Sequence, residues 1–424
     1  MTNFCTLFDH NYLSRGMALY QSLQEQCSDS FTLHILATDD VAVDWLNKQG
    51  YKNVVVQSLN DIKEMYPVLN RLQEERTRAE FSWTLSSFSI QFFLKKFNLE
   101  SVTYLDADMY FYADPQILFD ELDGESVIIT PHNYTPRYDQ SETSGRYCVQ
   151  FMYFKNDDGG NKVLEWWRNA CEECCCGTPT DGKFGDQKYL DDWLSRFPGI
   201  VHEEKHMGCG IAPWNVQQFD VLEEEGKLFV LNKITKLKDR IVFYHFHSLR
   251  KYIFNKEVLW STSNYLTSDS VKEVFYKGYI RKLEFLYKTD DIVISEYKLD
   301  NSVICDDIRF EIIKKIPLIN GINNIEEKSF VLYGYGKIGK SIYTMLKNEI
   351  NLCAICDRNL KNMMVDSYQI KDINICVEKF KDSIYLITPQ KGYIDIAIEL
   401  IKFNIKKENI YIFNQFAEKF IGVI

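Results

Sequence analysis

The stretch SVTYLDADMYFYADP, residues 101–115, decides the fold prediction. It opens with an apolar run that is typical of a buried β-strand, and Asp106 and Asp108 follow that run directly. Two carboxylates at the end of a strand can both reach one divalent cation if the backbone turns there, and oxygen ligands suit Mn²⁺ or Mg²⁺. A D-x-D sequence is also common as a turn or helix cap. The apolar strand before it and the turn marked by Asp114-Pro115 after it favour a metal site.

The sequence around this stretch alternates short apolar runs with amphipathic helices, which predicts an α/β fold. Strands are expected at FCTLF (4–8), FTLHILATD (31–39), KNVVVQSL (52–59), SVIITPHNY (126–134) and VQFMYFKND (149–157). Helices are expected over residues 16–26, 71–97 and 163–177. Ligands of open α/β sheets lie at the carboxyl ends of the strands. Asp9, Asp39 and Asp106 are therefore expected near one edge, as a site for a cation or a sugar.

Composition divides the 424 residues into parts, as expected for a chain of two or three domains. All seven tryptophans lie at or before Trp260, whereas residues 261–424 hold 29 isoleucines against 11 in residues 1–260. We predict a catalytic domain over 1–265, a helical connector over 266–324 and a small domain over 325–424. The helical spacing of apolar residues in 268–300 indicates the connector.

The net charge of −11, from 49 basic and 60 acidic residues, argues against a nucleic-acid-binding surface. No apolar run is long enough to predict a membrane-spanning helix, and the first residues lack the pattern of a signal peptide. The 12 cysteines form no disulfide-scaffold pattern, so a reducing cytoplasm is expected, with peripheral association at the inner face of the membrane left open. Cys171-x-x-Cys174 could bind zinc, but a buried apolar helix face of Cys171, Cys174 and Cys175 is the favoured interpretation.

A second apolar run, DRIVFYHFH (239–247), ends in histidines. His245 is a plausible third ligand beside a carboxylate pair, and His247 is an alternative. A histidine in such a position is more often a hydrogen-bonded structural residue. The pair of histidines, in a chain with only seven, favours a site. Arg250 and Lys251 follow and would complement phosphate groups.

FGDQKYLDDW (184–193) places Asp186 after a glycine, where it could orient a sugar hydroxyl. The competing interpretation is an N-cap for the following helix, for which aspartate is well suited. The loop around Trp214 suits either sugar recognition or ordinary packing. Arg78 and Glu80, on the helix before the D-x-D strand, could form a solvated charged face.

These residues resemble a known family. YLDADMYFYADP (104–115) is similar to the metal-binding strand of GT-A glycosyltransferases, especially family 8 galactosyl- and glucosyltransferases, which carry a near-identical YLDxDxxxxxD stretch. The resemblance covers residues 1–260. It implies a GT-A fold, a mixed sheet flanked by helices, and metal-dependent transfer from a UDP-sugar with retention at the anomeric carbon. By this match Asp106 and Asp108 bind the metal and the donor.

Other matches follow in the family's order. CTLFDHNYLSRGMALYQSL (5–23) resembles the opening nucleotide-binding strand and helix, FGDQKYLDDW a donor-sugar motif, and HFHSLRK (245–251) the family's H-x-x-G-x-x-K. The resemblance implies that the donor base and ribose contact Asp9, Asn11 and Tyr12, and that the donor sugar and the acceptor face Asp186 and Gln187. It implies that His245 is the third metal ligand and that Lys251 contacts the diphosphate. It also implies that Arg78 contacts the donor. Ser248 replaces the motif's glycine, Tyr252-Ile253 replace Pro-Trp, and Thr143-Ser144-Gly145 replace Asn-Ser/Ala-Gly, which indicates a divergent subfamily.

The C-terminal part carries a second pattern in SFVLYGYGKIGKSIYTMLKNEINLCAICDRN (329–359). An apolar strand enters Gly334-x-Gly336-x-x-Gly339, a helix follows, and a second strand ends at Asp357. This is a fair fingerprint of a Rossmann-like nucleotide site, with Asp357 on ribose hydroxyls. The other interpretation is that the glycines only permit tight strand–helix packing. Further strands are expected at INICVE (373–378), SIYLIT (383–388) and NIYIFN (409–414).

The leading hypothesis is a hexosyltransferase that moves a sugar from a nucleotide-diphosphate sugar to a hydroxyl of a glycan or a lipid-linked saccharide. Mn²⁺ or Mg²⁺ is the expected cofactor, with a nucleotide or dinucleotide at the C-terminal domain. An NAD-dependent nucleotide-sugar oxidoreductase or epimerase is the first alternative, although the C-terminal unit is short for one. A non-catalytic nucleotide-binding scaffold is the second.

Overall fold

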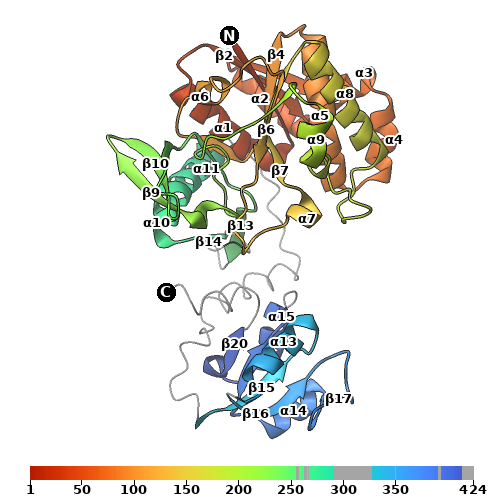
Figure 1. Cartoon of the computed structure of the whole chain (residues 1–424), viewed down its shortest axis with the longest axis vertical. Coiled ribbons are helices and arrows are strands. Elements are labelled where there is room, and N and C mark those ends of the chain that lie inside the picture. The colour runs from red at the N-terminus through yellow and green to blue at the C-terminus, as the bar shows by residue number, and fades with distance from the viewer. Residues whose placement is uncertain are drawn as a thin grey trace. The chain divides into compact units, whose positions relative to one another are not determined.

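The computed structural model describes residues 1–254, 257–261, 265, 267–289, 327–348, 350–389 and 393–412, except for some side chains, including those of residues 250–259. The chain forms two compact units, drawn in Figure 1. The first unit comprises Met1–Lys251 and Trp260–Glu296, and the second comprises Tyr252–Leu259 and Tyr297–Ile424. Most of the predicted connector, residues 290–324, lies outside the described residues.

A seven-stranded mixed sheet is the centre of the first unit, in the order β3-β2-β1-β4-β7-β6-β8. Its strands are β1 (Thr2–Phe8), β2 (Phe31–Ala37), β3 (Val54–Ser58), β4 (Ser101–Leu105), β6 (Val127–Pro131), β7 (Tyr147–Lys155) and β8 (Val201–Glu203). The first four in spatial order are parallel, β7 is antiparallel to β4 and β6, and β8 is parallel to β6. The unit is therefore α/β with a mostly parallel central sheet, and the expected strands form.

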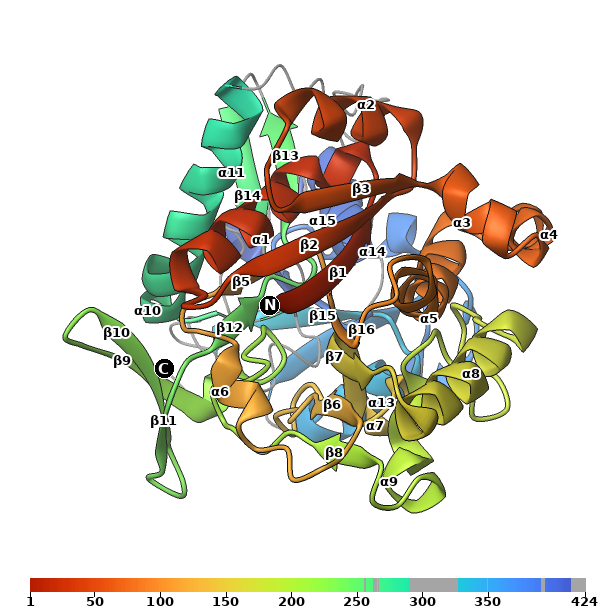
Figure 2. The ribbon, with the colours of Figure 1, turned by 90° about the horizontal axis from the view of Figure 1, so that it is seen from above.

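Alternation along β1 sends apolar side chains to both faces of the sheet. Phe4 and Phe8 enter one core with helices α1 (Leu13–Gln26) and α11 (Lys277–Thr289), whereas Cys5 and Leu7 enter a second core. The second core includes helices α5 (Arg78–Lys96) and α8 (Asp158–Glu173). Figure 2 shows these two helix pairs on opposite sides of the strands. Two buried faces explain why the parallel strands read as nearly continuous apolar runs.

Smaller elements complete the unit. The helices are η1 (His10–Tyr12), α2 (Asp40–Gln49), α3 (Leu59–Met65), α4 (Val68–Glu75), α6 (Gln116–Phe119), α7 (Ser141–Ser144), η2 (Lys188–Asp192), α9 (Trp193–Arg196), η3 (Val216–Gln218), α10 (Asp269–Val271) and the π-helical η4 (Lys272–Tyr276). The strands are β5 (Met109–Phe111), β9 (Phe219–Glu224), β10 (Lys227–Asn232), β11 (Lys238–Arg240) and β12 (Phe243–His245). The two-stranded pair of β13 (Arg250–Phe254) and β14 (Glu257–Ser261) spans the residues at which the chain passes from one unit to the other. The helix predicted after residue 268 packs into the first core through Phe275, Tyr279 and Leu283.

The helix predicted over 71–97 is two helices, so that prediction is corrected. The chain is extended at Arg76 and Thr77, and Thr77 caps α5. The Thr77 hydroxyl accepts a hydrogen bond from the Glu80 N–H, and the Glu80 carboxylate accepts one from the Thr77 N–H at 2.9 Å. This capping box has the sequence signature T-x-x-E, which marks the start of a helix. It starts a new helix at Arg78 although the helical spacing of apolar residues continues across this point.

The stretch 101–115 forms two strands that are separated by a turn. β4 ends at Leu105, and β5 begins at Met109 in a separate two-stranded sheet with β12. The turn between them is closed by a bond of 3.3 Å from the Met109 N–H to the Asp106 carbonyl. The two carboxylates of the D-x-D sequence therefore lie in the turn that joins two sheets.

The cysteine face predicted for the helix of residues 163–177 forms only in part. Helix α8 ends at Glu173 and Cys174 is its C-cap, so Cys174–Cys176 leave the helical spacing. Cys171 is buried in the second core, and the described cysteines are free thiols. No cluster of metal-ligating side chains among the described residues includes Cys171 or Cys174.

The second unit holds a parallel sheet in the order β16-β15-β19-β20. Its elements are β15 (Ser329–Tyr333), α13 (Lys337–Leu346), β16 (Asn351–Cys356), β17 (Met364–Val365), β18 (Tyr368–Gln369), α14 (Ile373–Lys379), β19 (Ile384–Ile387), α15 (Tyr393–Lys402), η7 (Lys407–Asn409) and β20 (Ile410–Ile412). The strands expected at SIYLIT and NIYIFN form, but INICVE is helix α14, capped by Asp372. Six residues are too few to separate a buried strand from a short helix by spacing alone.

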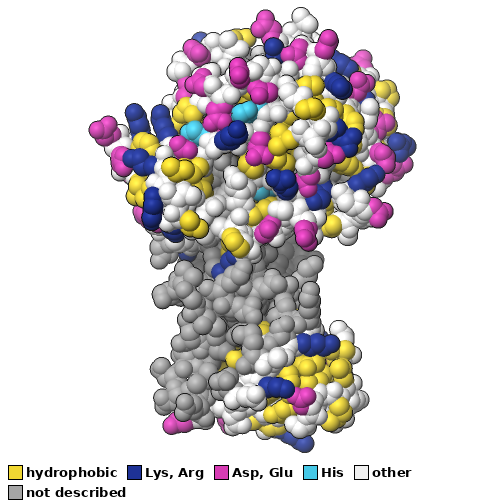
Figure 3. Space-filling view, in the orientation of Figure 1, with side chains coloured by type: hydrophobic (Ala, Val, Ile, Leu, Met, Phe, Trp, Pro, Cys, Tyr) yellow, Lys and Arg dark blue, Asp and Glu magenta, His cyan; other side chains and the backbone are white. Residues whose placement is uncertain are grey.

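The surface mixes both signs of charge. On the face of the first unit in Figure 3, basic and acidic side chains are interspersed, with no single basic patch on that face. Among the described residues, no helix combines the length and apolarity required to cross a lipid bilayer.

We expect the stability of the first unit to fall in mild acid because of His34 on β2. This side chain is 3 % exposed and packs against Phe93 and Phe97. Burial lowers the pKa of His34 to about 4, against about 6.5 in an unfolded chain. The unfolded chain thus binds the extra proton first. The contribution of neutral His34 is complete above pH 6.5 and is lost as the pH falls towards 4, by about 3 kcal/mol in total.

Urea unfolding of the wild-type protein and of His34→Gln between pH 4 and 8 measures this contribution. Because glutamine does not titrate, the free energy of unfolding of His34→Gln should fall by about 3 kcal/mol less than that of the wild-type protein between pH 6.5 and pH 4. The difference between the two proteins at pH 8 gives the packing change alone. Parallel curves from pH 8 to pH 4 would show that His34 is not the group responsible.

Candidate active site

A cavity of about 420 Å³ opens where β1 and β4 end. Parallel pairing of β1 with β2 and β4 brings the residues after these strands to one edge of the sheet. The cavity is lined by Leu7, Tyr12, Ser82, Trp83, Ser86, Tyr104, Asp106, Ala107, Asp108, His132, Tyr134, Gln140, Ser144, Cys148, Val149, Phe184, Gly185, Asp186, Gln187, Trp214, His245, His247 and Tyr265. It therefore combines carboxylates, imidazoles and aromatic rings, which is the lining expected of a site for a polar ligand with flat apolar faces.

His245 and the two D-x-D carboxylates converge on this cavity. β12 pairs with β5 so that His245 lies opposite Met109, one residue after the turn. The His245 Nε2 atom is 3.1 Å from Asp108 Oδ1 and 3.8 Å from Asp106 Oδ2. The His245 side chain is only 4 % exposed. Three potential ligands from two chain segments thus face one another.

Gln150 on β7 fixes the orientation of that imidazole. Its Oε1 atom lies 2.7 Å from His245 Nδ1, and its backbone carbonyl accepts a hydrogen bond from the Asp106 N–H at 3.0 Å. An oxygen acceptor at Nδ1 favours a proton there, so Nε2 is the ring nitrogen that faces the carboxylates and would ligate a cation after giving up its proton. A donor set of two carboxylates and one imidazole fits Mn²⁺ or Mg²⁺.

The carboxylates differ in their electrostatic surroundings. Loss of hydration raises the pKa of Asp106 to about 6. The attraction of His245 acts in the opposite direction, and the repulsion of Asp108 adds to the increase. Burial also favours the neutral form of Asp108, but attraction and a hydrogen bond from His245 outweigh it and lower the pKa to about 2. Negative charge crowded at one point of a cavity wall is what a divalent cation would neutralise.

Asp186 lies on the same cavity and does not cap a helix. It is buried, and its pKa is raised to about 7 by loss of hydration and then by the repulsion of Asp106, against a hydrogen bond from Ser86. The Trp167 indole donates to its backbone carbonyl at 2.8 Å. The following 3-10 helix η2 has Gln187 as its N-cap, with no side-chain capping bond.

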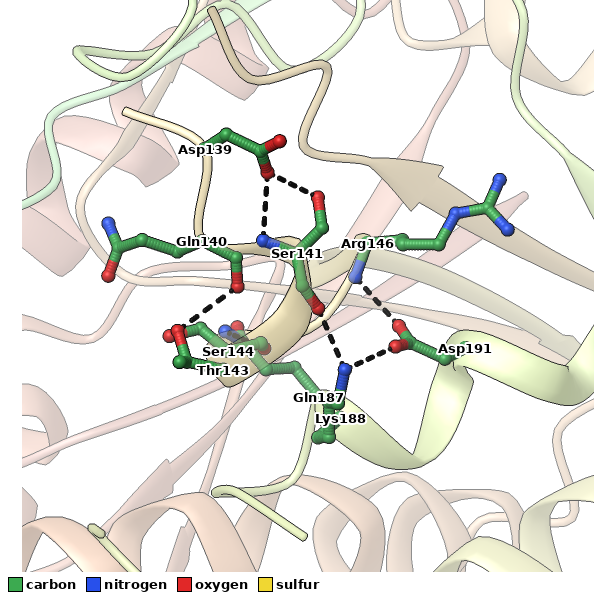
Figure 4. A network of polar contacts seen from close by, with 9 residues as sticks. All are labelled: Asp139, Gln140, Ser141, Thr143, Ser144, Arg146, Gln187, Lys188 and Asp191. Carbon is green, nitrogen blue, oxygen red and sulfur yellow. Dashed lines mark hydrogen bonds and ion pairs between the residues drawn. The ribbon is translucent and has the colours of Figure 1, made fainter. Parts of the chain in front are cut away.

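Gln187 is held by its neighbours. Its Nε2 donates to the Ser144 carbonyl at 2.7 Å, which ties the loop to α7. Figure 4 shows the surrounding network. Lys188 Nζ donates to the Ser141 carbonyl at 2.7 Å and to Asp191 Oδ2 at 2.8 Å, and Asp191 Oδ1 accepts from the Arg146 N–H at 2.7 Å. The wall that carries Asp186 and Gln187 is therefore cross-linked to the start of β7.

No family model matches the sequence. A curated relative from Bacillus subtilis strain 168, named "Uncharacterized protein YfnF", is 31 % identical over 255 residues, which is 58 % of this chain and 81 % of YfnF. The chain belongs to the family of YfnF. A second relative from the same organism, "Uncharacterized protein YfnD", is 28 % identical over 248 residues, covering 58 % of this chain and 76 % of YfnD.

Several solved structures similar to this YfnF-family chain are glycosyltransferases. The galactosyltransferase LgtC, in complex with donor and acceptor sugar analogues, gives a TM-score of 0.43 at 9 % identity over 67 % of this chain and 96 % of LgtC. The glycosyltransferase GlyE of Streptococcus pneumoniae TIGR4 gives 0.40 at 12 % identity over 97 % and 90 %. Mouse xyloside xylosyltransferase 1 gives 0.37 at 13 % identity over 57 % and 97 %.

Other residues predicted for the donor lie outside the cavity lining, although Tyr12 is part of it. Asp9 caps η1 through a bond of 2.9 Å from the Asn11 N–H and pairs with Arg78, whose side chain is 71 % exposed. Asp39 caps α2 through the Ala42 N–H and contacts His10 Nδ1 at 2.6 Å. These contacts stabilise the local turns, so donor binding by Asp9, Asn11, Asp39 and Arg78 stays a prediction.

The predicted phosphate contacts can be placed only in part. His247 lines the cavity, with its ring 5.4 Å from that of Trp214. Ser248 adopts φ 59°, in the left-handed region that favours glycine, which explains why a glycine suits the motif at this position. Lys251 belongs to β13, and its side chain lies outside the described residues, as does that of Arg250.

Tyr134 and Gln150 belong to this YfnF-family site but were not predicted from sequence, whereas the loop of Trp214 was left open between sugar recognition and packing. Trp214 is both a packing anchor, since its Nε1 donates to the His132 carbonyl at 2.9 Å, and part of the cavity wall. Tyr134 stacks on His132 with ring centroids 4.5 Å apart. Gln150 could have been found, because it is the one uncharged amide within the otherwise apolar strand VQFMYF.

Two glycines of the second unit, Gly334 and Gly339, permit a close approach of neighbouring backbone or side chains. A Cβ at Gly339 would lie 2.9 Å from the Gly334 carbonyl carbon, and Gly334 itself has φ 98°. Asp357 accepts hydrogen bonds from the Tyr335 N–H at 2.7 Å and from the turn that follows it. This geometry favours close strand–helix packing, and nucleotide binding by Gly334, Gly336, Gly339 and Asp357 stays a prediction.

We expect Gln150→Met to weaken Mn²⁺ binding by about 10- to 100-fold, because an imidazole without its partner is no longer held in the ligating tautomer. Titration of the protein with Mn²⁺, followed by the paramagnetic signal of the free ion, gives the affinity. Gln150→Glu keeps an acceptor oxygen and should retain binding. Gln140→Met, on the same cavity, is the matched control. Equal affinities for all four proteins would show that Gln150 does not position a ligand.

Proposed function

We propose that the first unit is a metal-dependent glycosyltransferase that takes a nucleotide-diphosphate sugar, a UDP-sugar, as its donor. The observation that carries this proposal is the convergence of Asp106, Asp108 and His245 Nε2 on one cavity at the carboxyl ends of parallel strands. The sequence motifs that resemble family 8 supply the donor class, and the aromatic lining suits sugar faces.

Asp106, Asp108 and His245 would hold the cation in this proposal. Mn²⁺ or Mg²⁺ supplies charge neutralisation at the diphosphate and stabilises the departing nucleotide diphosphate. Gln150 keeps the imidazole in the ligating tautomer. Lys251 is assigned to the diphosphate by its motif.

In this proposal Asp186 contacts the sugar rather than the cation. It is a buried carboxyl beside the carboxylate of Asp106, with a pKa raised to about 7. Its carboxylate oxygens can accept hydrogen bonds from sugar hydroxyls. Gln187 contributes its carbonyl oxygen, since its amide nitrogen is engaged with Ser144. Retention at the anomeric carbon, and a glycan or lipid-linked saccharide as acceptor, complete the proposal.

A panel of nucleotide sugars tests the donor assignment. The full chain is incubated with UDP-, GDP- and TDP-sugars in Mn²⁺, Mg²⁺ or excess chelator, and release of the nucleoside diphosphate is followed. Slow hydrolysis of one UDP-sugar that stops in chelator supports the proposal and names the sugar. If no nucleotide sugar binds in any metal while NAD binds tightly, transfer chemistry is excluded in favour of the oxidoreductase.

A further inference from the structure

A second group of metal-ligating side chains lies on the first unit, and none of its members lines the active-site cavity. Glu121, His202 and Glu204 each offer a ligand atom, and these atoms all lie within 4.8 Å of one another. The His202 Nε2 atom is 3.3 Å from Glu121 Oε2. Two carboxylates and one imidazole therefore share a small volume.

The backbone places these residues at an edge of the central sheet. β8 is the last strand of the sheet, and His202 lies opposite Ile128 of β6 in the parallel register. The Glu204 N–H donates to the Ile129 carbonyl at 3.0 Å, which extends the ladder by one residue. Glu121 comes from the turn that follows α6. The group thus joins the edge strand to the segment that precedes β6.

Glu204 is the unusual member. Its side chain is buried, with the residue 2 % exposed. Its Oε1 atom accepts a hydrogen bond from the His206 N–H at 2.9 Å, and the Lys205 N–H and the Glu121 carboxyl also interact with this side chain. Among the described residues, no hydrogen bond of standard geometry reaches its buried Oε2 atom. A buried carboxylate oxygen without a donor is costly, and the cost is removed by a cation or a shared proton.

The surrounding charge favours a cation as the missing partner. Loss of hydration raises the pKa of Glu204 to about 8. The hydrogen bond from the His206 N–H lowers this pKa in part, and the charge of Glu121 raises it further. Burial, and then the charges of Glu204 and Glu121, raise the pKa of the Cys209 thiol. Lys205 and His202 are near enough to lower the pKa of Glu125, but among the described residues neither side chain forms a hydrogen bond with Glu204. Two carboxyl groups therefore meet at this point without a basic side chain bonded to Glu204.

We propose that Glu121, His202 and Glu204 form a second divalent-cation site, separate from the active site, that fastens β8 to the segment after α6. One imidazole nitrogen with two carboxylate oxygens suits Zn²⁺ or Mn²⁺. Its role is structural, since none of the three residues faces the cavity. The proposal does not depend on the function assigned to that cavity.

The test counts metal ions and measures thermal unfolding in an Asp108→Asn background, in which the active site is disabled. After equilibration with Zn²⁺ or Mn²⁺ and gel filtration, the Asp108→Asn protein should keep one ion per chain. Its unfolding temperature should rise with the metal. Adding Glu204→Gln should abolish both effects, whereas Glu125→Gln, at a half-buried neighbour outside the group, should change neither.

His202→Asn is the second variant, in case Glu204→Gln fails to fold, and it should also lose the ion. Activity of the Glu204→Gln single variant should stay at the wild-type level, which separates this site from the catalytic proposal. Retention of the ion by both variants would show adventitious binding and overturn the proposal. An Asp108→Asn protein that binds no ion would also overturn the proposal. If its unfolding temperature then changes only with pH near 8, the two carboxyl groups share a proton instead of a cation.

Discussion

Asp108→Asn is expected to lower the rate of sugar transfer by about 10³-fold while the protein remains folded. Asparagine has the same shape but no charge, and the pKa of Asp108, lowered to about 2, means that the wild-type group is ionised at neutral pH. The variant therefore loses a ligand and a negative charge. Without the cation, charge on the departing nucleotide diphosphate is no longer neutralised.

The loss should appear in kcat and in the affinity for Mn²⁺, both measured with the donor that the panel identifies. Asp181→Asn is the matched control, since Asp181 is exposed and has φ 49°, a conformation that asparagine accepts readily. It makes the same change of charge away from the ligands. An Asp108→Asn enzyme that keeps more than about a tenth of the wild-type kcat would contradict a metal-bound donor.

Gly208→Ala is expected to reduce the free energy of unfolding by at least about 3 kcal/mol. A Cβ at this position would lie 2.7 Å from the Arg240 carbonyl carbon and 2.9 Å from Ile241 Cα, both backbone atoms that cannot rotate away. The Gly208 carbonyl also accepts a hydrogen bond from the Val242 N–H at 2.9 Å. Relief of the clash must therefore separate two hydrogen-bonded segments.

The same substitution should reach the active site. The loop after Gly208 continues to Ile211, whose carbonyl accepts the His245 N–H at 2.8 Å, and to Trp214 on the cavity wall. Urea unfolding and Mn²⁺ affinity are measured on the same protein. Gly278→Ala is the control, because nothing lies within 4 Å of its added Cβ and alanine favours the interior of helix α11. A Gly208→Ala protein as stable as Gly278→Ala would refute the close approach.

Local patterns predicted the parallel strands and the position of the carboxylates. Each of β1, β2 and β4 is an apolar run that is followed within two residues by an aspartate. The same stretch of sequence therefore indicates both the strand and the carboxylate at its end. His245 could be proposed because its strand ends in the same way. The order of the strands in the sheet, by contrast, was not predicted. Only the general rule that ligands bind at the carboxyl ends of strands was available.

What the sequence could not predict depends on contacts between distant segments. The partner of His245 is Gln150, and nothing near either residue indicates the other. Asp186 reads equally well as a helix cap, and only burial beside Asp106 distinguishes the two roles. INICVE carries the composition of a strand, but Asp372 caps it as a helix that packs on the sheet of the second unit.

The separation of the site residues along the chain has a consequence for folding kinetics. Asp108 and His245 are 137 residues apart, and Gln150 and His245 are 95 residues apart. Contacts at such separation carry a large cost in loop-closure entropy, so we expect them to form late in folding. A cation held by these residues can recognise only the finished unit, so it slows unfolding without guiding the earlier collapse.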